Sequence, residues 1–117
     1  DGDAVVLCDR FSDSTVAYQQ YGRGLDSSLI AAVNEAATGG LTPALTVLLD
    51  LSPAEAQARG GPKTDYMERE ALAFHERVRD GYLTQAAAEP QRWLVLDATG
   101  SIEHLTDAIW ERIASLL

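Results

Sequence analysis

Three short, largely apolar runs are each followed by an aspartate. The runs and their aspartates are residues 4–8 (AVVLC) with Asp9, residues 45–49 (LTVLL) with Asp50, and residues 93–96 (WLVL) with Asp97. Runs of this length fit strands of a parallel sheet that is buried on both faces. Ligands of such sheets bind beyond the carboxyl ends of the strands. The aspartates therefore lie where a site would form, although an aspartate there also serves as a turn or cap residue.

The segments between the runs show the three- and four-residue spacing of helices. Asp26 or Ser27 is expected to cap one helix, Ser52 and Pro53 to begin a second, and Ser101 to cap the last. The positions expected to face the core are Leu29, Ile30, Val33 and Ala37; Met67, Ala71, Phe74, Val78, Tyr82 and Ala86 before Pro90; and Ile102, Leu105, Ile109, Ile113 and Leu116. Strands alternating with helices predict an α/β fold, with helices on both faces of a parallel sheet in three layers.

The most informative stretch is residues 9–19, DRFSDSTVAYQ. Asp9 and Arg10 follow the first predicted strand, and a helix is expected to start with Ser12 or Asp13 as its cap. Four polar side chains then recur four residues apart in two pairs, Ser14 with Tyr18 and Thr15 with Gln19. On a helix they form one continuous polar edge. That edge could contact a base and a sugar, or it could be a solvated helix face, and the pattern alone leaves both open.

Composition narrows the class of partner. The chain has 117 residues, 46% of them hydrophobic, and a net charge of −9. This charge argues against nucleic acid and anionic membranes as partners, while a few aimed arginines can still hold a phosphate. The sequence shows no run of membrane-spanning length and no signal peptide, so we expect a cytoplasmic protein. Cys8 is expected to be a buried strand residue, and His75 and His104 to be surface residues rather than metal ligands.

The stretch DRFSDSTVAYQQYGRGLD, residues 9–26, resembles the thymidylate kinase motif DR[YFH]xxSxxAYQ and the Gly-Arg segment after it. Residues 41–53 (LTPALTVLLDLSP) resemble the family's strand segment, although Ala44 replaces its usual aspartate. Residues 74–83 (FHERVRDGYL) and 96–98 (LDA) resemble its later helix and last strand. The resemblance covers the whole chain in order. It implies that residues 1–117 form a single partial domain of the P-loop NTPase type. This domain would be the C-terminal part of a nucleoside monophosphate kinase.

The resemblance implies phosphoryl transfer from ATP to dTMP with Mg²⁺, in a homodimer. Arg10 would bind the dTMP phosphate, with Ser14 beside it. Thr15 and Gln19 would contact the base, and Tyr18 would lie beneath the sugar. We expect Asp9 to orient Arg10 or to hold a water on Mg²⁺ rather than to act as a general base. The reason is that a phosphate monoester, with a second pKa of about 6, is largely deprotonated at neutral pH.

A lid is expected at residues 59–68. By resemblance, Arg59 would flank the ATP adenine and Lys63 would reach the transferring phosphate. Glu68 keeps the acid of the family's D-R-x-E motif, whereas Tyr66 stands where that motif has its arginine. Lysine is a weaker bidentate partner for phosphate than arginine, so this lid departs from the family pattern.

The phosphate-binding pattern GxxxxGK[ST] is absent from the 117 residues. In the family it follows a first strand, which lies between the strands corresponding to residues 4–8 and 45–49. We therefore expect that the chain alone neither forms the native sheet nor catalyses the reaction. The missing neighbour would come from a longer protein or a partner chain, unless these two strands pair directly. Two other functions stay open, a non-catalytic nucleotide-binding or dimerisation remnant and a deoxynucleoside kinase.

Overall fold

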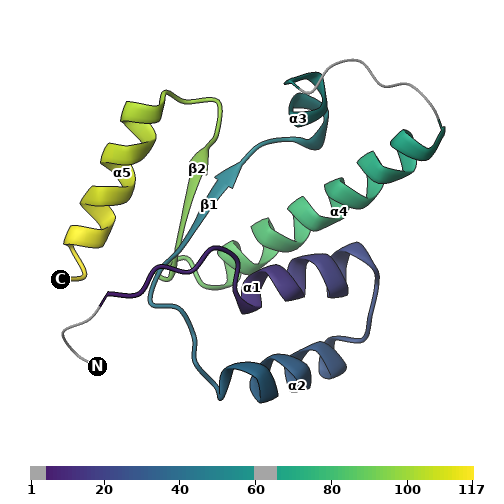
Figure 1. Ribbon diagram of the computed structural model, residues 1–117, viewed down its shortest axis with the longest axis horizontal. Coiled ribbons are helices and arrows are strands. Elements are labelled where there is room, and N and C mark those ends of the chain that lie inside the picture. Colours follow the sequence, from purple (N-terminus) through teal and green to yellow (C-terminus); the bar gives the residue numbers. More distant parts are fainter. Residues whose placement is uncertain (1–4, 60–65) are drawn as a thin grey trace.

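The computed structural model describes residues 5–59 and 66–117. Its elements are α1 (Ser12–Thr15), the π-helical segment η1 (Val16–Gly22), α2 (Ser27–Thr38), β1 (Thr46–Asp50), α3 (Pro53–Arg59), α4 (Tyr66–Ala88), β2 (Trp93–Asp97) and α5 (Ile102–Ala114). The strands lie side by side, with α5 to one side of them and α4 to the other (Figure 1). This order confirms a partial α/β fold with a parallel sheet.

The sheet within the described residues has two parallel strands. β1 and β2 pair from Thr46 opposite Trp93 to Asp50 opposite Asp97, so both predicted aspartates end at the same edge. α3 and α4 supply the crossover that a parallel connection requires. The Cα radius of gyration is 15.9 Å, against about 13 Å for a compact domain of this length. The fold is therefore more open than that of a complete domain.

The helix starts predicted at Asp26, Ser52 and Ser101 are confirmed by their caps. The Asp26 carboxylate accepts from the Leu29 backbone N–H at 3.1 Å, and the Ser101 hydroxyl accepts from that of His104 at 3.1 Å. Ser52 accepts from the Glu55 N–H at 3.1 Å and donates to the Glu55 carboxylate at 2.9 Å. Each bond supplies a partner for a backbone donor that the first helical turn leaves free.

The prediction of a strand at residues 4–8 is wrong for the described residues 5–8, which have no regular secondary structure. Val6 and Leu7 are each 84% exposed, and Cys8 is an exposed free thiol rather than a buried strand residue. A strand forms only where a neighbour accepts and donates its backbone hydrogen bonds. In the described sheet β1 pairs with β2, and residues 5–8 form no strand beside either of them. Direct pairing of the first two predicted strands is thereby excluded in this structure.

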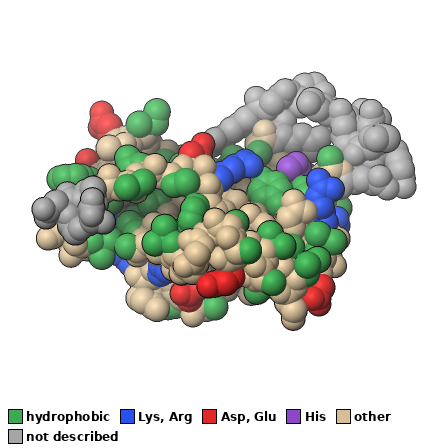
Figure 2. Space-filling model, turned by 60° about the horizontal axis from the view of Figure 1, so that its bottom comes forward, with side chains coloured by type: hydrophobic (Ala, Val, Ile, Leu, Met, Phe, Trp, Pro, Cys, Tyr) green, Lys and Arg blue, Asp and Glu red, His purple; other side chains and the backbone are tan. Residues whose placement is uncertain are grey.

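Two helical faces predicted to be core are only partly covered. On α2, Ile30 is buried, but Leu29, Val33 and Ala37 are exposed. On α5, Ile102 is exposed and none of the residues is buried, and Leu116, beyond the end of this helix, is exposed as well. Figure 2 shows apolar side chains spread over the visible surface rather than gathered inside. The predicted helical periodicity is confirmed, but the described residues include no further element that covers these faces.

The best-packed region is the contact of α4 with η1. Ala17 and Val78 are buried there. A Cβ on Gly22 would come within 2.8 Å of the Phe74 ring, and one on Gly81 within 2.8 Å of the Tyr21 ring. The two glycines therefore allow the helices to approach more closely than any larger residue would permit. This contact fixes the segment that carries Tyr18 and Gln19, two of the predicted dTMP-binding residues.

Candidate functional site

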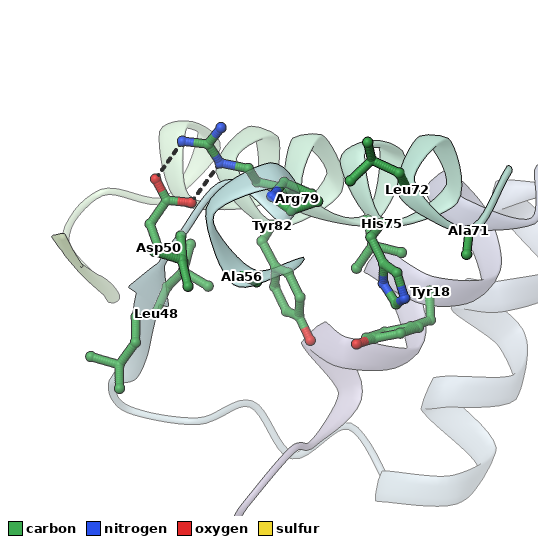
Figure 3. A pocket seen from close by; sticks show the side chains of 13 residues that line it. Tyr18, Leu48, Asp50, Ala56, Ala71, Leu72, His75, Arg79 and Tyr82 are labelled. Carbon is green, nitrogen blue, oxygen red and sulfur yellow. Dashed lines mark hydrogen bonds and ion pairs between the residues drawn. The ribbon is translucent and has the colours of Figure 1, made fainter. Parts of the chain in front are cut away.

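A pocket of about 490 Å³ opens beside the carboxyl end of β1. Figure 3 shows side chains from β1, α3, α4 and η1 around it. Its lining residues are Tyr18, Leu48, Leu49, Asp50, Leu51, Pro53, Ala56, Ala71, Leu72, His75, Val78, Arg79 and Tyr82. The size suits a small organic ligand, and the mixture of apolar walls with a few polar groups is typical of such sites.

Asp50 and Arg79 form the charged pair of this pocket. Arg79 Nε and Nη2 donate to the two carboxylate oxygens of Asp50 at 2.8 and 2.9 Å (Figure 3). This hydrogen bonding raises the pKa of Arg79 above its ordinary value. The planar, two-bond geometry is the strongest form of such a pair. The ion pair joins the end of β1 to α4, so the Asp50 carboxylate makes a structural contact with Arg79.

Asp97, at the equivalent position of β2, has a turn role. Its Oδ1 accepts from the Thr99 backbone N–H at 2.9 Å and from the Thr99 hydroxyl at 2.6 Å. Asp97 thus serves as a turn residue, which is one of the roles that the sequence left open for these aspartates.

The polar edge predicted at residues 14–19 lies on α1 and η1. The Arg23 backbone N–H donates to the Tyr18 carbonyl five residues earlier at 3.0 Å, the bonding that defines a π-helix. Single π-helical turns recur at functional sites. Thr15 and Gln19 are half-buried on this segment. The helix predicted here is confirmed, but its wider turn was not expected.

Arg10 and Tyr18 lie together. Arg10 Nη2 donates to the Tyr18 hydroxyl at 3.4 Å, and the guanidinium carbon is 5.2 Å from the centre of the Tyr18 ring. Arg10 has a φ of 64°, the left-handed backbone region that a residue with a Cβ adopts only at a cost of about 1–2 kcal/mol. Strain of this kind gathers at ligand sites. Arg10 is exposed, and its role in binding a phosphate stays a prediction.

Ser14 is joined to α4 rather than to Arg10. The Tyr82 hydroxyl donates to Ser14 Oγ at 2.7 Å, across 68 residues of sequence. Burial raises the pKa of Tyr82, which keeps this donor protonated near neutral pH. The Tyr82 ring meets the Tyr18 ring edge-on, with centroids 6.3 Å apart. Sequence analysis placed Tyr82 in the core face of its helix and missed this polar contact.

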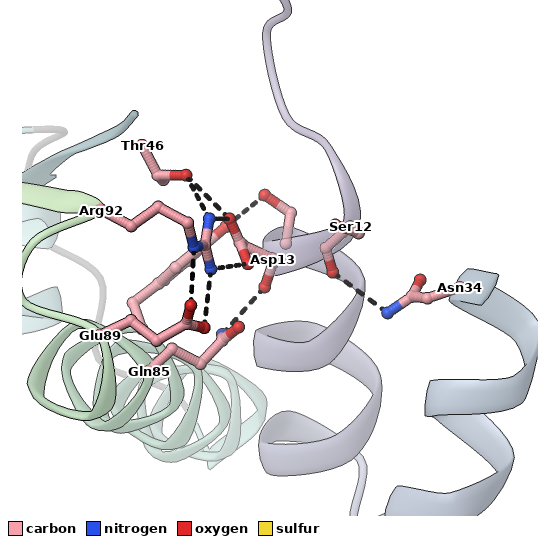
Figure 4. Close-up of polar contacts among 9 residues, drawn as sticks. Ser12, Asp13, Asn34, Thr46, Gln85, Glu89 and Arg92 are labelled. Atoms are coloured by element: carbon pink, nitrogen blue, oxygen red, sulfur yellow. Dashed lines mark hydrogen bonds and ion pairs between the residues drawn. The ribbon is translucent and has the colours of Figure 1, made fainter. Parts of the chain in front are cut away.

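Asp13 does not cap its helix, contrary to the prediction. The cap position is Phe11, without a side-chain bond, and Asp13 is buried. Its carboxylate accepts two bonds of 3.0 Å from Arg92 and one of 2.8 Å from the Thr46 hydroxyl (Figure 4). Glu89 accepts from the same guanidinium at 3.2 and 3.3 Å. This network joins the start of the polar segment to the amino ends of both strands. The hydrogen bonds between Arg92 and Asp13 raise the pKa of Arg92 above its ordinary value.

Asp9 is exposed, and the ion pairs found among the described residues do not include it. A role in orienting Arg10 stays a prediction. Within the described residues there is also no group of three or more histidine, cysteine or acidic side chains suited to a metal ion. Magnesium in phosphate-transfer sites is held by one or two carboxylates together with substrate phosphates. A single exposed carboxylate beside Arg10 fits that arrangement.

The lid residues are not placed. Lys63 lies outside the described residues, and the side chains of Arg59, in α3, and Glu68, in α4, also lie outside them. Their roles stay predictions. His75 and His104 are exposed, as expected, and His75 stacks edge-on against Phe74 at 5.4 Å. No helix in the described parts of the chain combines the length and the apolar character needed to cross a bilayer.

Comparisons with known proteins show the family of this chain. The sequence model of the thymidylate kinase family, "Thymidylate kinase", matches residues 1–109. The chain is 52% identical to the thymidylate kinase of Deinococcus radiodurans over 113 residues, covering 93% of the chain and 54% of that protein. It is 50% identical to that of Geobacter sp. strain M21, with 95% and 55% covered.

The fold has a counterpart among solved structures. The crystal structure of thymidylate kinase from Ehrlichia chaffeensis superimposes with a TM-score of 0.65 and 33% sequence identity, covering 98% of this chain and 52% of that one. The chain spans about half the length of the relatives it matches. It belongs to the thymidylate kinase family, a family of P-loop nucleotide-binding transferases, and corresponds to the C-terminal portion of its members.

Proposed function

We propose that this chain supplies the dTMP-binding part and the lid of a kinase that transfers a phosphoryl group from ATP to dTMP, giving dTDP. The observation that supports this most is the cluster of Arg10, Tyr18, Ser14 and Tyr82, of which Tyr18 and Tyr82 also line the pocket. It combines a strained, exposed arginine with a half-buried aromatic and hydroxyl surface. These are the groups that a phosphate and a nucleoside require.

The reaction brings two anions together, so positioning and charge neutralisation dominate its catalysis. Arg10 would bind the dTMP phosphate through its planar fork and offset the repulsion from ATP. Tyr18 would support the sugar, and Ser14 would lie near the phosphate. Thr15 and Gln19 would contact the base. Arg59, Lys63 and Glu68 would form the lid over ATP.

When bound with ATP, Mg²⁺ would supply positive charge that offsets the charge developing on the phosphates. Asp9 would hold one of its water molecules, consistent with the exposed carboxylate next to Arg10. Donor phosphates are held in P-loop enzymes by a glycine-rich loop and its lysine. Because that pattern is absent from these residues, we propose that activity requires a P-loop half in addition to this chain.

The working protein would be a cytoplasmic homodimer. The exposed apolar residues of α2, such as Leu29 and Val33, are compatible with a further partner surface. Sedimentation equilibrium of the active protein and fractionation of the source cells test these two points. A monomeric active protein would refute the first, and recovery outside the cytoplasm the second.

The decisive experiment compares the chain alone with a joined protein. In the joined protein, the segment of the Deinococcus radiodurans kinase that precedes its match is fused to the start of this chain. ADP release with ATP and Mg²⁺ is measured against dTMP, dUMP and thymidine. We expect turnover with dTMP for the joined protein only, and loss of most of it in Arg10→Ala.

Each outcome separates the candidate functions. A folded joined protein without dTMP turnover would refute the proposal, and preference for thymidine would indicate a deoxynucleoside kinase. Turnover by the chain alone would refute the need for a P-loop half. Binding of dTMP without turnover, by calorimetry, would indicate a non-catalytic nucleotide-binding remnant.

A further inference from the structure

Tyr82 of α4 contacts two of the predicted dTMP-binding residues at once. Its hydroxyl donates to Ser14 Oγ at 2.7 Å, and its ring lies edge-on to that of Tyr18 at 6.3 Å. Figure 3 shows the Tyr82 and Tyr18 side chains pointing into the same pocket. Tyr18 in turn accepts from Arg10 at 3.4 Å. Tyr82 therefore contacts Ser14 and Tyr18 directly and is linked to Arg10 through Tyr18.

The position of Tyr82 is set by close packing on both sides. The preceding residue, Gly81, is buried and lies so close to Tyr21 that a Cβ there would be 2.8 Å from its ring. On its other side the Tyr82 ring meets Trp93 of β2, with centroids 6.4 Å apart. A ring held between a helix and a strand has little freedom, so its hydroxyl is presented to Ser14 in one place.

Ser14 needs such a partner. A serine hydroxyl rotates to suit its neighbours, and near the start of a helix it can also turn back to the local backbone. An oxygen that accepts from Tyr82 keeps its own proton for a second acceptor, such as a phosphate or sugar oxygen. The bond thus directs the serine proton away from Tyr82.

We propose that Tyr82 is a positioning residue for the acceptor side of the site, which orients the Ser14 hydroxyl and the Tyr18 ring toward dTMP. This rests on the proposed function. It predicts an effect on dTMP binding rather than on ATP binding or on the chemical step. A purely structural tyrosine would instead lower stability and leave the balance between the two substrates unchanged.

The test is a double-mutant cycle in the joined protein, with Tyr82→Phe, Ser14→Ala and both together. Removing the shared bond is expected to raise the KM for dTMP about fivefold in each single variant, the size of one net hydrogen bond. The double variant should be no worse than the more affected single variant. The KM for ATP and kcat should stay within about twofold of the parent, the usual limit of uncoupled effects.

Two further variants serve as controls. Tyr21→Phe removes a hydroxyl from the same helical segment, next to Gly81, and should leave the KM for dTMP unchanged. Ser14→Thr keeps the hydroxyl and should retain most of the affinity that Ser14→Ala loses. Tyr82→Phe keeps the ring, and Ser14→Ala removes the same bond from the other side, so the inference does not depend on either variant alone.

An unchanged KM for dTMP in Tyr82→Phe, or single effects that multiply in the double variant, would overturn the positioning role alone. Equal rises in the KM for both substrates would overturn it as well, because they indicate general destabilisation. Absence of dTMP turnover in the unsubstituted joined protein would overturn the proposed function, and the positioning role with it.

Discussion

The buried pair of Asp13 and Arg92 offers the sharpest test of how this fold is held together. The two side chains are 12% and 11% exposed, and they share two hydrogen bonds of 3.0 Å. The Thr46 hydroxyl donates a third bond to Asp13 at 2.8 Å. Asp13→Ala removes all three and leaves the guanidinium with Glu89, which is 49% exposed, and with the Thr46 hydroxyl, to which Arg92 Nη1 donates at 3.1 Å.

The expected loss follows from what remains. Breaking a buried ion pair by removing one partner costs about 3–5 kcal/mol when the other charge is left uncompensated. Here Glu89 still compensates Arg92 from the solvent side, so we expect about 2–3 kcal/mol. With a urea m-value of about 2 kcal/mol/M, the midpoint of unfolding should fall by about 1–1.5 M.

The assay is urea unfolding of the joined protein, followed by circular dichroism. Asp107→Ala removes an exposed carboxylate of α5 and serves as the matched control, with an expected change within about 0.5 kcal/mol. The double variant Asp13→Ala/Arg92→Met should be more stable than the sum of the single losses predicts, because it leaves neither charge buried.

A loss below about 1 kcal/mol in Asp13→Ala would refute the reasoning, since that is the range of solvent-exposed pairs. Strictly additive single losses would refute it too. Raising the salt concentration to 1 M should change the loss little, because buried pairs are screened much less than exposed ones.

Three further outcomes are expected. Gly81→Ala should cost about 1–3 kcal/mol by overpacking against Tyr21, while Gly100→Ala, whose Cβ would lie 3.4 Å from its nearest neighbour, should cost less, by urea midpoints. At Arg10, where φ is 64°, glycine should be more stable than alanine by about 1 kcal/mol, while both abolish most dTMP turnover; a more stable alanine variant would contradict the strain. Burial raises the pKa of Tyr82, so the folded state holds that proton more tightly than the unfolded chain. The unfolding free energy should therefore fall above about pH 10, and it should fall less in Tyr82→Phe. If the urea midpoint of unfolding depended on pH in the same way in the parent and in Tyr82→Phe, that would contradict this expectation.

Much of this molecule could be predicted from its sequence because the signals are local. The caps at Asp26, Ser52 and Ser101 each join groups three residues apart, so a short sequence pattern specifies them completely. The apolar character of the runs that end at Asp50 and Asp97 predicted two strands of a parallel sheet, and these strands pair in the structure. The motif at residues 9–19 indicated the family, and the family comparison confirmed it.

Other features depended on which elements meet in space. The run at residues 5–8 has the composition of a strand, but its conformation depends on a neighbour that the described sheet does not provide. Ser14 and Tyr82 lie 68 residues apart, and Asp13 and Arg92 lie 79 residues apart. No spacing rule links such positions. Their pairing arises only when α4 packs on η1 and the strands align beside them.

The sequence by itself thus indicated the family, the helix starts at Asp26, Ser52 and Ser101, and the residues predicted to bind dTMP. Tertiary structure alone decided what holds those residues in place, namely Tyr82 behind Ser14 and Arg92 behind Asp13. The physical reason is that a cap is satisfied within one turn of helix, whereas a buried polar side chain must find its partner across the fold.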